Sequence, residues 1–198
     1  MEIFYLRKDE FLNSIDIETL KRFSDGRSYL CNEKYLEHLC GLFLTKFVAK
    51  NIYGRTNTDI VLHGDKPEFV LKGLHFSISH SKNIVLVAFN NSETGVDVEY
   101  MRPRNFEKIL KRCNRSEENP TREYFYKFWT VREAEIKLGK EITSLFSTVL
   151  ENDYIVSCVS SSILITNFKI KRLSFKKDAQ NIDLVQEFTR PLILNFSS

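Results

Sequence analysis

The chain contains 198 residues, of which 42% are hydrophobic and 28% charged, and its formal net charge is +3. This composition is enough to bury a core, in one domain or in two small ones. The small net charge gives no support to nucleic-acid binding, although it is compatible with a phosphate-bearing ligand or an acidic protein partner.

The sequence also argues against secretion and against a membrane span. Charged residues at positions 7–10 interrupt the N-terminus, where a signal peptide would be apolar. The most apolar stretch, residues 39–49, contains Lys46 and is too short to cross a bilayer. The four cysteines show neither a C-x-x-C pair nor zinc-finger spacing, so we expect reduced, mostly buried thiols in a cytoplasmic protein.

The first elements predicted are a strand at residues 2–6, a polar helical segment at 11–23 and a stronger helix capped by Asn32. That helix is predicted because its apolar residues recur at steps of three and four. They are Leu36, Leu39, Cys40, Phe43, Phe47 and Val48. Gly41 lies inside the helix at a cost of about 1 kcal/mol relative to alanine. Either a close contact at this glycine or a neutral substitution accounts for it.

A polar connection and short extended segments follow. Residues 60–62 predict a short strand or turn, and the glycine and proline of residues 63–67 predict a loop. Residues 74–81 alternate in polarity, and residues 83–89 are apolar. Because Ser81 and Lys82 lie between these runs, the economical interpretation is a β-hairpin.

Residues 94–99 predict a strand with a polar and an apolar face. Val96 and Val98 fall on one face, and Asp97 and Glu99 on the other. Two carboxylates two residues apart repel each other unless a cation or a proton lies between them, so this strand is a candidate site for a hard divalent ion. The same alternation is typical of any half-exposed strand, and the spacing alone favours that plainer interpretation.

The second half of the chain predicts two further helices and a series of strands. A short helix is expected at residues 106–113, and Asn119 with Pro120 would cap and start a helix at 121–138 that ends at Gly139. The rest alternates in short runs typical of antiparallel strands, at residues 154–159, 163–167, 168–175 and 184–188. No internal repeat is visible in the residues.

The helix at 121–138 carries two stripes at steps of three and four. One stripe comprises Phe125, Phe128, Arg132 and Ile136, and its neighbour comprises Tyr126, Trp129, Glu133 and Lys137. Glu133 and Lys137 form an i,i+4 pair in the favoured order. The plain interpretation is a surface salt bridge worth a few tenths of a kcal/mol. The alternative is a further metal ligand beside a phosphate-binding lysine.

Together these segments form one pattern. Residues 95–99 (G-V-D-V-E) and 128–137 (F-W-T-V-R-E-A-E-I-K) resemble the two-part signature of the 4′-phosphopantetheinyl transferases, G-[VI]-D-x-E followed by W-[ST]-x-[KR]-E-[AS]-x-x-K. Residues 76–81 (F-S-I-S-H-S) are similar to the F-N-x-S-H-S element of that family, and residues 64–67 (G-D-K-P) to its G-K-P loop. Each motif is weak by itself, but four in the right order are specific.

The resemblance implies an α+β fold. The length is that of the larger, surfactin-type transferases, which are pseudo-dimers of two similar α+β halves, each with an antiparallel sheet and a long helix. We therefore expect an N-terminal half at residues 1–94 on the CoA nucleotide side, and a C-terminal half at residues 95–198 with the metal-binding strand and catalytic helix. A monomer is expected.

The resemblance also implies the reaction and the residues that perform it. The 4′-phosphopantetheine group of coenzyme A would pass to a serine of an acyl or peptidyl carrier protein, releasing adenosine 3′,5′-bisphosphate. Mg²⁺ would be held by Asp97, Glu99 and Glu133, and the sequence leaves open whether Glu133 is a ligand, the base or both. Lys137 would neutralise the leaving bisphosphate, with Arg132 assisting.

The resemblance also assigns residues to the nucleotide of coenzyme A. Ser79 and His80 would hold its 3′-phosphate, and Lys66 with Pro67 would line the adenine side. Taken alone, His80 would be interpreted as a strand-end histidine with a backbone partner.

The chain departs from the family pattern at several positions. Arg132 replaces the usual lysine and keeps its charge, and Asp65 is an addition to the G-K-P loop. Glu37 stands where the family often has an arginine before its helix glycine, which puts nucleotide contacts from that helix in doubt. The short stretch at residues 100–132 bears on the choice of carrier protein.

Two other classes of function remain open. A Mg²⁺-dependent nuclease would use the same three acids and ignore coenzyme A. A non-catalytic binder of coenzyme A or of a carrier protein would share the fold. Retention of the three acids and Lys137 argues against such a binder, which need not keep the metal-binding set.

Overall fold

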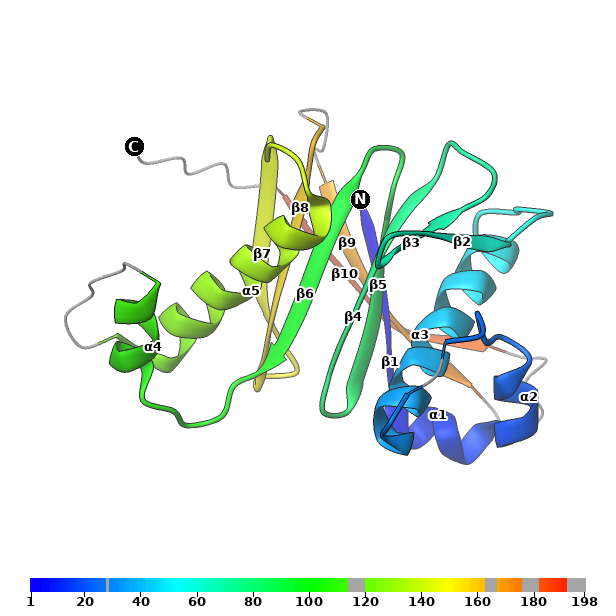
Figure 1. The fold of residues 1–198 in the computed structure, drawn as a ribbon, viewed down its shortest axis with the longest axis horizontal. Coiled ribbons are helices and arrows are strands. Elements are labelled where there is room, and N and C mark those ends of the chain that lie inside the picture. The colour runs from blue at the N-terminus through cyan, green and yellow to red at the C-terminus, as the bar shows by residue number, and fades with distance from the viewer. Residues whose placement is uncertain (28, 114–119, 163–166, 176–181, 192–198) are drawn as a thin grey trace.

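The computed structural model describes residues 1–198 apart from 28, 114–119, 163–166, 176–181 and 192–198, and for residues 182–191 it describes the backbone alone (Figure 1). The elements of the N-terminal part are β1 (Glu2–Arg7), α1 (Lys8–Ser14), α2 (Ile17–Lys21), α3 (Asn32–Asn51), β2 (Ile60–His63), β3 (Lys66–Phe69), β4 (His75–Ser81) and β5 (Ile84–Asn90). Those that follow are β6 (Thr94–Tyr100), α4 (Phe106–Arg112), α5 (Arg122–Leu138), β7 (Ser144–Leu150), β8 (Tyr154–Ser160), β9 (Asn167–Phe175) and β10 (Ile182–Pro191).

The fold is α+β, as predicted, and is built in layers (Figure 1). A 5-stranded sheet has the order β10-β9-β1-β5-β4, a 3-stranded sheet has the order β6-β8-β7, and β2 and β3 form a separate hairpin. Helix α3 covers the outer face of the larger sheet, and α5 covers the outer face of the smaller one. The two sheets therefore face each other between the two helices.

Alternation along β1 shows how the sequence creates these layers. Phe4 and Leu6 pack in the core beneath α3, whereas Ile3 and Tyr5 pack in the core between the two sheets. Successive side chains of a strand point to opposite faces, so a strand that is apolar at every position suits a sheet that is covered on both sides.

The larger sheet joins segments that are distant in the sequence. Strand β1 pairs antiparallel with β5, and on its other edge it pairs parallel with β9, placing Glu2 opposite Lys169. Strand β10 then extends the sheet beyond β9. The predicted division between residues 1–94 and 95–198 is therefore not followed by the sheets, because β9 and β10 belong to the sheet of β1.

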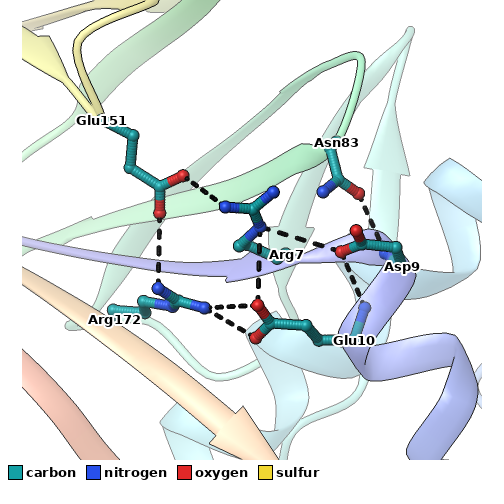
Figure 2. Close-up of polar contacts among 6 residues, drawn as sticks. All are labelled: Arg7, Asp9, Glu10, Asn83, Glu151 and Arg172. Atoms are coloured by element: carbon teal, nitrogen blue, oxygen red, sulfur yellow. Dashed lines mark hydrogen bonds and ion pairs between the residues drawn. The ribbon is translucent and has the colours of Figure 1, made fainter.

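A network of alternating charges fastens β9 and the β7–β8 turn to the end of β1 (Figure 2). Arg172 of β9 donates from Nη2 to both carboxylate oxygens of Glu10, each at 2.6 Å. Arg7 donates to Glu151 at 3.3 Å, and Nη1 of Arg172 lies 3.8 Å from the other oxygen of Glu151. Each of these ions therefore has partners of opposite sign on a different element.

Helix boundaries differ from prediction where local capping decides them. Helix α3 starts at Asn32 with Cys31 as its N-cap, so Asn32 is the first helical residue and not the cap. The polar segment expected at 11–23 is divided between two short helices, because the backbone is extended at Ile15 and Asp16, and Asp16 caps α2.

The start of helix α5 is likewise set by its capping residue. Thr121 is its N-cap and accepts a hydrogen bond from the backbone of Tyr124. The cap predicted at Asn119 lies outside the described residues. At the other end, the prediction of Gly139 is confirmed: it has a φ of 68° and its N–H donates to the carbonyl of Glu135.

Neither of the two stripes noted on α5 coincides with its buried face. The buried residues are Phe125, Tyr126, Thr130, Ala134 and Leu138. Arg132 and Ile136, of the stripe that starts at Phe125, are exposed, Ile136 by 64%. Large aromatic side chains are buried near the start of α5, and the small side chain of Ala134 is buried where the helix backbone approaches Gly95.

Strand β7 was not predicted, and the strand expected at 163–167 falls largely on residues outside the description. The cysteines that the structure describes are all free thiols, of which Cys40 and Cys158 are buried, Cys31 is exposed and Cys113 is half-buried. Within the described part of the chain, no helix combines the length and the apolarity needed to cross a membrane.

Candidate active site

A ladder of serine hydroxyls joins the two sheets at the site. Strands β4 and β6 belong to different sheets, yet the β4 serines accept hydrogen bonds from backbone N–H groups of β6. The pairs are Ser77 with Val96 at 3.1 Å, Ser79 with Val98 at 3.2 Å and Ser81 with Tyr100 at 3.1 Å. The ladder is regular because side chains on one face of a strand recur every two residues.

The same serines hold the two acids of β6. Ser79 donates to Asp97 Oδ1 at 2.7 Å, and Ser81 donates to Glu99 Oε2 at 2.9 Å. Asp97 is buried and Glu99 half-buried, while Val96 and Val98 are buried between the sheets. The prediction that these acids share one face and the valines the other is therefore confirmed.

Gly95 brings α5 against β6. A β-carbon on Gly95 would lie 2.0 Å from the carbonyl oxygen of Ala134 and 2.8 Å from the backbone nitrogen of Leu138. Only glycine permits backbones to approach this closely. As a result Lys137, on the same turn of α5, donates to Asp97 Oδ1 at 2.8 Å and to the carbonyl of Val96 at 3.0 Å.

Glu133 lies one helical turn before Lys137 and is half-buried. Leu138 of α5 adjoins Gly95, and Phe125 shares a core cluster with Met101, so α5 and β6 run in opposite directions. Glu133 is therefore displaced from Lys137 in the direction in which β6 leads to Glu99.

The electrostatics of the two acids fit a bound cation. Within the described residues, Oδ2 of Asp97 is buried and has no hydrogen-bond partner, an arrangement that costs about 1–3 kcal/mol for a buried acceptor. Burial raises the pKa of Glu99, with the charge of Asp97 adding to the shift while the Ser81 hydroxyl opposes it. A divalent cation would satisfy both groups.

The third predicted metal ligand, Glu133, has less support from the structure. Among the residues that the structure describes, no three His, Cys, Asp or Glu side chains are grouped closely enough to hold a metal ion. The assignment of Asp97, Glu99 and Glu133 as Mg²⁺ ligands therefore stays a prediction.

A pocket of about 660 Å³ opens beside the Lys137–Asp97 pair. It lies between β4, the start of α3, the β2–β3 turn and the end of α5. Its cationic and imidazole side chains are Arg27, Lys34, His38, His63, Lys66, His80 and Lys137, and Asp65 is the acidic residue of the lining. This size and this excess of positive charge suit an anion of nucleotide dimensions.

The pocket brings together four of the residues predicted for coenzyme A: Lys66, Pro67, His80 and Lys137. Lys66 and Pro67 lie on β3 and not in the predicted loop, which is reduced to the turn before that strand. The Lys66 ammonium reaches the carbonyl of Leu138 at 3.5 Å, so the β2–β3 hairpin contacts the end of α5.

The other two residues predicted for coenzyme A lie elsewhere. Ser79 is buried with its hydroxyl bonded to Asp97 and to the N–H of Val98. Arg132 is exposed and borders a second pocket of about 740 Å³, which shares Ile136 with the first. That pocket is lined by Cys113, Tyr124, Lys127, Phe128, Val131, Arg132, Glu135 and Ile136.

The structure adds residues that the sequence did not indicate. Asp25 accepts from the His38 ring at 2.9 Å and pairs with Arg27 at 3.0 Å, which fastens the loop before α3 to that helix. The ring of Tyr29 lies 5.0 Å from that of His38. The sequence signal that could have indicated this side of the pocket is the pair Lys34 and His38, four residues apart on α3. The loop before α3 shows no periodic pattern.

His80 has an environment of mixed charge at the edge of the pocket. Burial lowers the pKa of its imidazole, the carboxylate of Glu37 opposes that shift, and Lys137 and Lys8 add to it. His80 therefore rests as a neutral ring beside cations.

Comparison with known proteins finds relatives that share one name. No protein-family model matches the chain. Its curated relatives include the 4′-phosphopantetheinyl transferase ffp of Bacillus subtilis, 28% identical over 184 residues, which are 79% of this chain and 80% of the relative. A further 4′-phosphopantetheinyl transferase of Bacillus subtilis is 31% identical over 136 residues, 60% of each chain. The transferase HetI of Nostoc sp. is 34% identical over 85 residues, 37% of this chain and 35% of the relative.

A fourth relative is the 4′-phosphopantetheinyl transferase Sfp of Bacillus subtilis, 31% identical over 99 residues, which are 44% of each chain. All these matches agree with the motifs and with the α+β fold. These matches support the 4′-phosphopantetheinyl transferase superfamily, with its Sfp-like members, as the family that the chain resembles.

Proposed function

We propose that the protein transfers the 4′-phosphopantetheine group of coenzyme A to a serine hydroxyl of an acyl or peptidyl carrier protein. The products are the modified carrier and adenosine 3′,5′-bisphosphate. The observation that carries the proposal is the cationic pocket of about 660 Å³ that ends at the Lys137–Asp97 pair. Resemblance to the superfamily supplies the class of reaction.

In this proposal the pocket holds the nucleotide of coenzyme A. His80 and Lys66 provide positive charge for its phosphates, and Pro67 lines the adenine side. Ser79 remains assigned to the 3′-phosphate as well, although its hydroxyl already holds Asp97, and we give it the additional role of orienting that acid. Arg132 would act from the second pocket, toward the carrier protein and the transferred group.

Asp97 and Glu99 are the proposed Mg²⁺ ligands on β6, and Glu133 is the third. Mg²⁺ would supply charge neutralisation for the diphosphate. Lys137 stabilises negative charge on the leaving bisphosphate, because its ammonium is held in place by Asp97 and by the carbonyl of Val96. Glu133 also accepts the proton of the carrier serine, directly or through a water molecule.

The architecture proposed for the whole chain is a pseudo-dimer. Helix α3 on the larger sheet and α5 on the smaller sheet would be the equivalent elements of its two halves, with β9 and β10 added to the first. Because the pocket takes residues from both helices, one chain contains a complete site, and we propose a monomer that acts in the cytoplasm.

The test is to incubate the purified protein with coenzyme A, Mg²⁺ and a panel of apo carrier proteins, and to measure the carriers by intact mass. One added phosphopantetheine arm per carrier, lost when the metal is chelated, is the expected result. Asp97→Asn should abolish transfer. Asp153→Asn, which changes an exposed acid on the β7–β8 turn, is the matched control and should retain it.

Two results would contradict the proposal. Binding of coenzyme A without transfer to any carrier would indicate a non-catalytic binding module. Transfer by Asp97→Asn at the native rate would remove the assignment of the metal site.

A further inference from the structure

A chain of charged contacts leads from the first helix to His80. The ammonium of Lys8 donates to Glu37 Oε1 at 2.6 Å, and Glu37 Oε2 lies 3.2 Å from His80 Nδ1. The side chains of Lys8 and Glu37 are only 14% and 12% exposed. The three residues come from α1, α3 and β4, so the contact depends on the packing of all three elements.

Of Lys8, Glu37 and His80, only His80 faces the pocket. His80 belongs to the pocket lining, whereas Lys8 and Glu37 are not among the described residues that form it. Contact between Glu37 and a ligand in the pocket would therefore be relayed by the His80 ring.

We propose that Glu37, fixed by Lys8, is a positioning residue that accepts a hydrogen bond from Nδ1–H of His80 and so presents Nε2 to a phosphate of the ligand. This inference rests on the proposed function, because the phosphate is that of the coenzyme A nucleotide. Which nitrogen of an imidazole carries the proton is set by the partner of the other nitrogen. A neutral imidazole without a carboxylate partner has no such preference for Nδ1–H.

The charges around His80 make the carboxylate necessary. The ring faces Glu37 on α3, Lys8 on α1, Lys137 on α5 and Asp97 on β6. Without Glu37, two cations and partial burial would oppose protonation of the ring. With Glu37 in place, the ring can gain a proton when a phosphate arrives, and Nε2–H then donates a charge-assisted hydrogen bond.

A purely structural role for Glu37 is the competing explanation, since Lys8 also pairs with Glu33 at 3.3 Å. Glu33 therefore provides the matched control. It contacts the same lysine, its side chain is 73% exposed, and it is on the preceding turn of α3 and has no ion pair with His80 among the described residues.

The first measurement uses the protein without ligand. Nitrogen chemical shifts of the His80 ring, recorded by NMR across pH, report which nitrogen carries the proton. We expect Glu37→Gln to reduce the Nδ1–H population and to lower the pH at which the ring titrates. Lys8→Gln should also reduce the Nδ1–H population, because Glu37 is no longer fixed, and Glu33→Gln should leave the ring as in the native protein. An unchanged ring in Glu37→Gln would overturn the proposal.

The second measurement is calorimetric binding of coenzyme A and of dephospho-coenzyme A, which lacks the 3′-phosphate. Glu37→Gln should weaken coenzyme A about tenfold, as expected for the loss of a charge-assisted bond, and dephospho-coenzyme A much less. In a His80→Gln background the same change should have no further effect. A loss that persists in that background would show that Glu37 does not act through His80.

The two proposals fail in different ways. If the ring responds to Glu37→Gln but even the native protein binds no coenzyme A, the proposed function is wrong while Glu37 still orients His80. If coenzyme A binds and both variants at positions 37 and 33 behave alike, the positioning role is wrong and the proposed function stands.

Discussion

The ammonium of Lys137 and the carboxylate of Asp97 lie 2.8 Å apart although 40 positions separate them in the sequence. The contact is possible because α5 crosses β6 at Gly95, where a β-carbon would lie 2.0 Å from the carbonyl of Ala134. The glycine of the first motif and the lysine of the second are thus parts of one arrangement, and the predictions below test its components.

Gly95→Ala should displace α5 and separate Lys137 from Asp97. The added methyl group meets backbone atoms, which cannot rotate away, so we expect the free energy of unfolding to fall by about 1–3 kcal/mol. Transfer should fall by about 10²-fold, because a displacement of about 1 Å at a site has that effect. Thermal unfolding and the rate of carrier modification measure the two losses.

Gly41→Ala is the control for this change. Gly41 lies on α3, and a β-carbon there would lie 2.8 Å from a methyl group of Ile78 on β4. The Ile78 side chain can move to relieve this contact. Stability is expected to change and the Lys137–Asp97 contact to remain. Equal losses of transfer in the two variants would show that general destabilisation, and not the position of α5, is measured.

Ser79→Ala should lower transfer by about 10–100-fold, as is typical when a group that orients a metal ligand is removed. The variant loses the hydroxyl that donates to Asp97 at 2.7 Å. Ser77→Ala removes a comparable bond to a β6 N–H but touches no carboxylate. Both should lose similar stability, and a Mg²⁺ titration of activity should shift for Ser79→Ala much more than for Ser77→Ala.

Glu133→Gln should reduce the maximal rate by about 10²–10⁴-fold if this residue is a base as well as a ligand. Gln keeps the shape of the side chain and cannot take up the serine proton. Single-turnover transfer at saturating coenzyme A and Mg²⁺ separates the chemical step from binding. A native rate under those conditions would exclude Glu133 from both roles.

Asp25→Asn should lower stability in a manner that depends on pH. Burial alone would raise the pKa of Asp25, but hydrogen bonds from His38 and the N–H of Arg27, with the charges of both, lower it below its ordinary value of 3.8. A lowered folded-state pKa contributes stability above the unfolded-state value, and the contribution is lost as the pH falls through the folded-state value.

The expected loss for Asp25→Asn at neutral pH is about 1.5–3 kcal/mol, the range for a hydrogen bond to a charged group. The difference from the native protein should begin to shrink below about pH 4, where Asp25 is protonated in the unfolded state, and should disappear as the pH falls through the lower folded-state pKa. Urea unfolding at several pH values measures it. A difference that is constant across this range would mean that the Asp25 charge has no stabilising role.

Local patterns predicted the parts of the site that depend on neighbours in sequence. The alternation of β6 was sufficient to place Asp97 and Glu99 on one face, and Gly139 was sufficient to end α5. Gly41 was also informative, since the close contact that it permits is with Ile78 of β4.

The rest depended on contacts that no local pattern contains. The two stripes of α5 did not reveal its buried face, because Thr130 and Ala134 are buried where the helix packs against the sheet. The buried hydroxyl of Thr130 is hydrogen-bonded to the hydroxyl of Ser157 on β8 at 2.6 Å. The strands that pair with β9 could not be predicted from the sequence, because strand order in a sheet is set by tertiary packing.

The pairing of β1 with two strands has a consequence for synthesis on the ribosome. Strand β5 is complete at Asn90, whereas β9, which occupies the other edge of β1, begins at Asn167. During the interval that edge presents unpaired backbone N–H and C=O groups, which are a template for association with other chains. A nascent polypeptide arrested in this interval is therefore expected to aggregate or recruit a chaperone, and the liability ends when β9 pairs with Glu2–Tyr5.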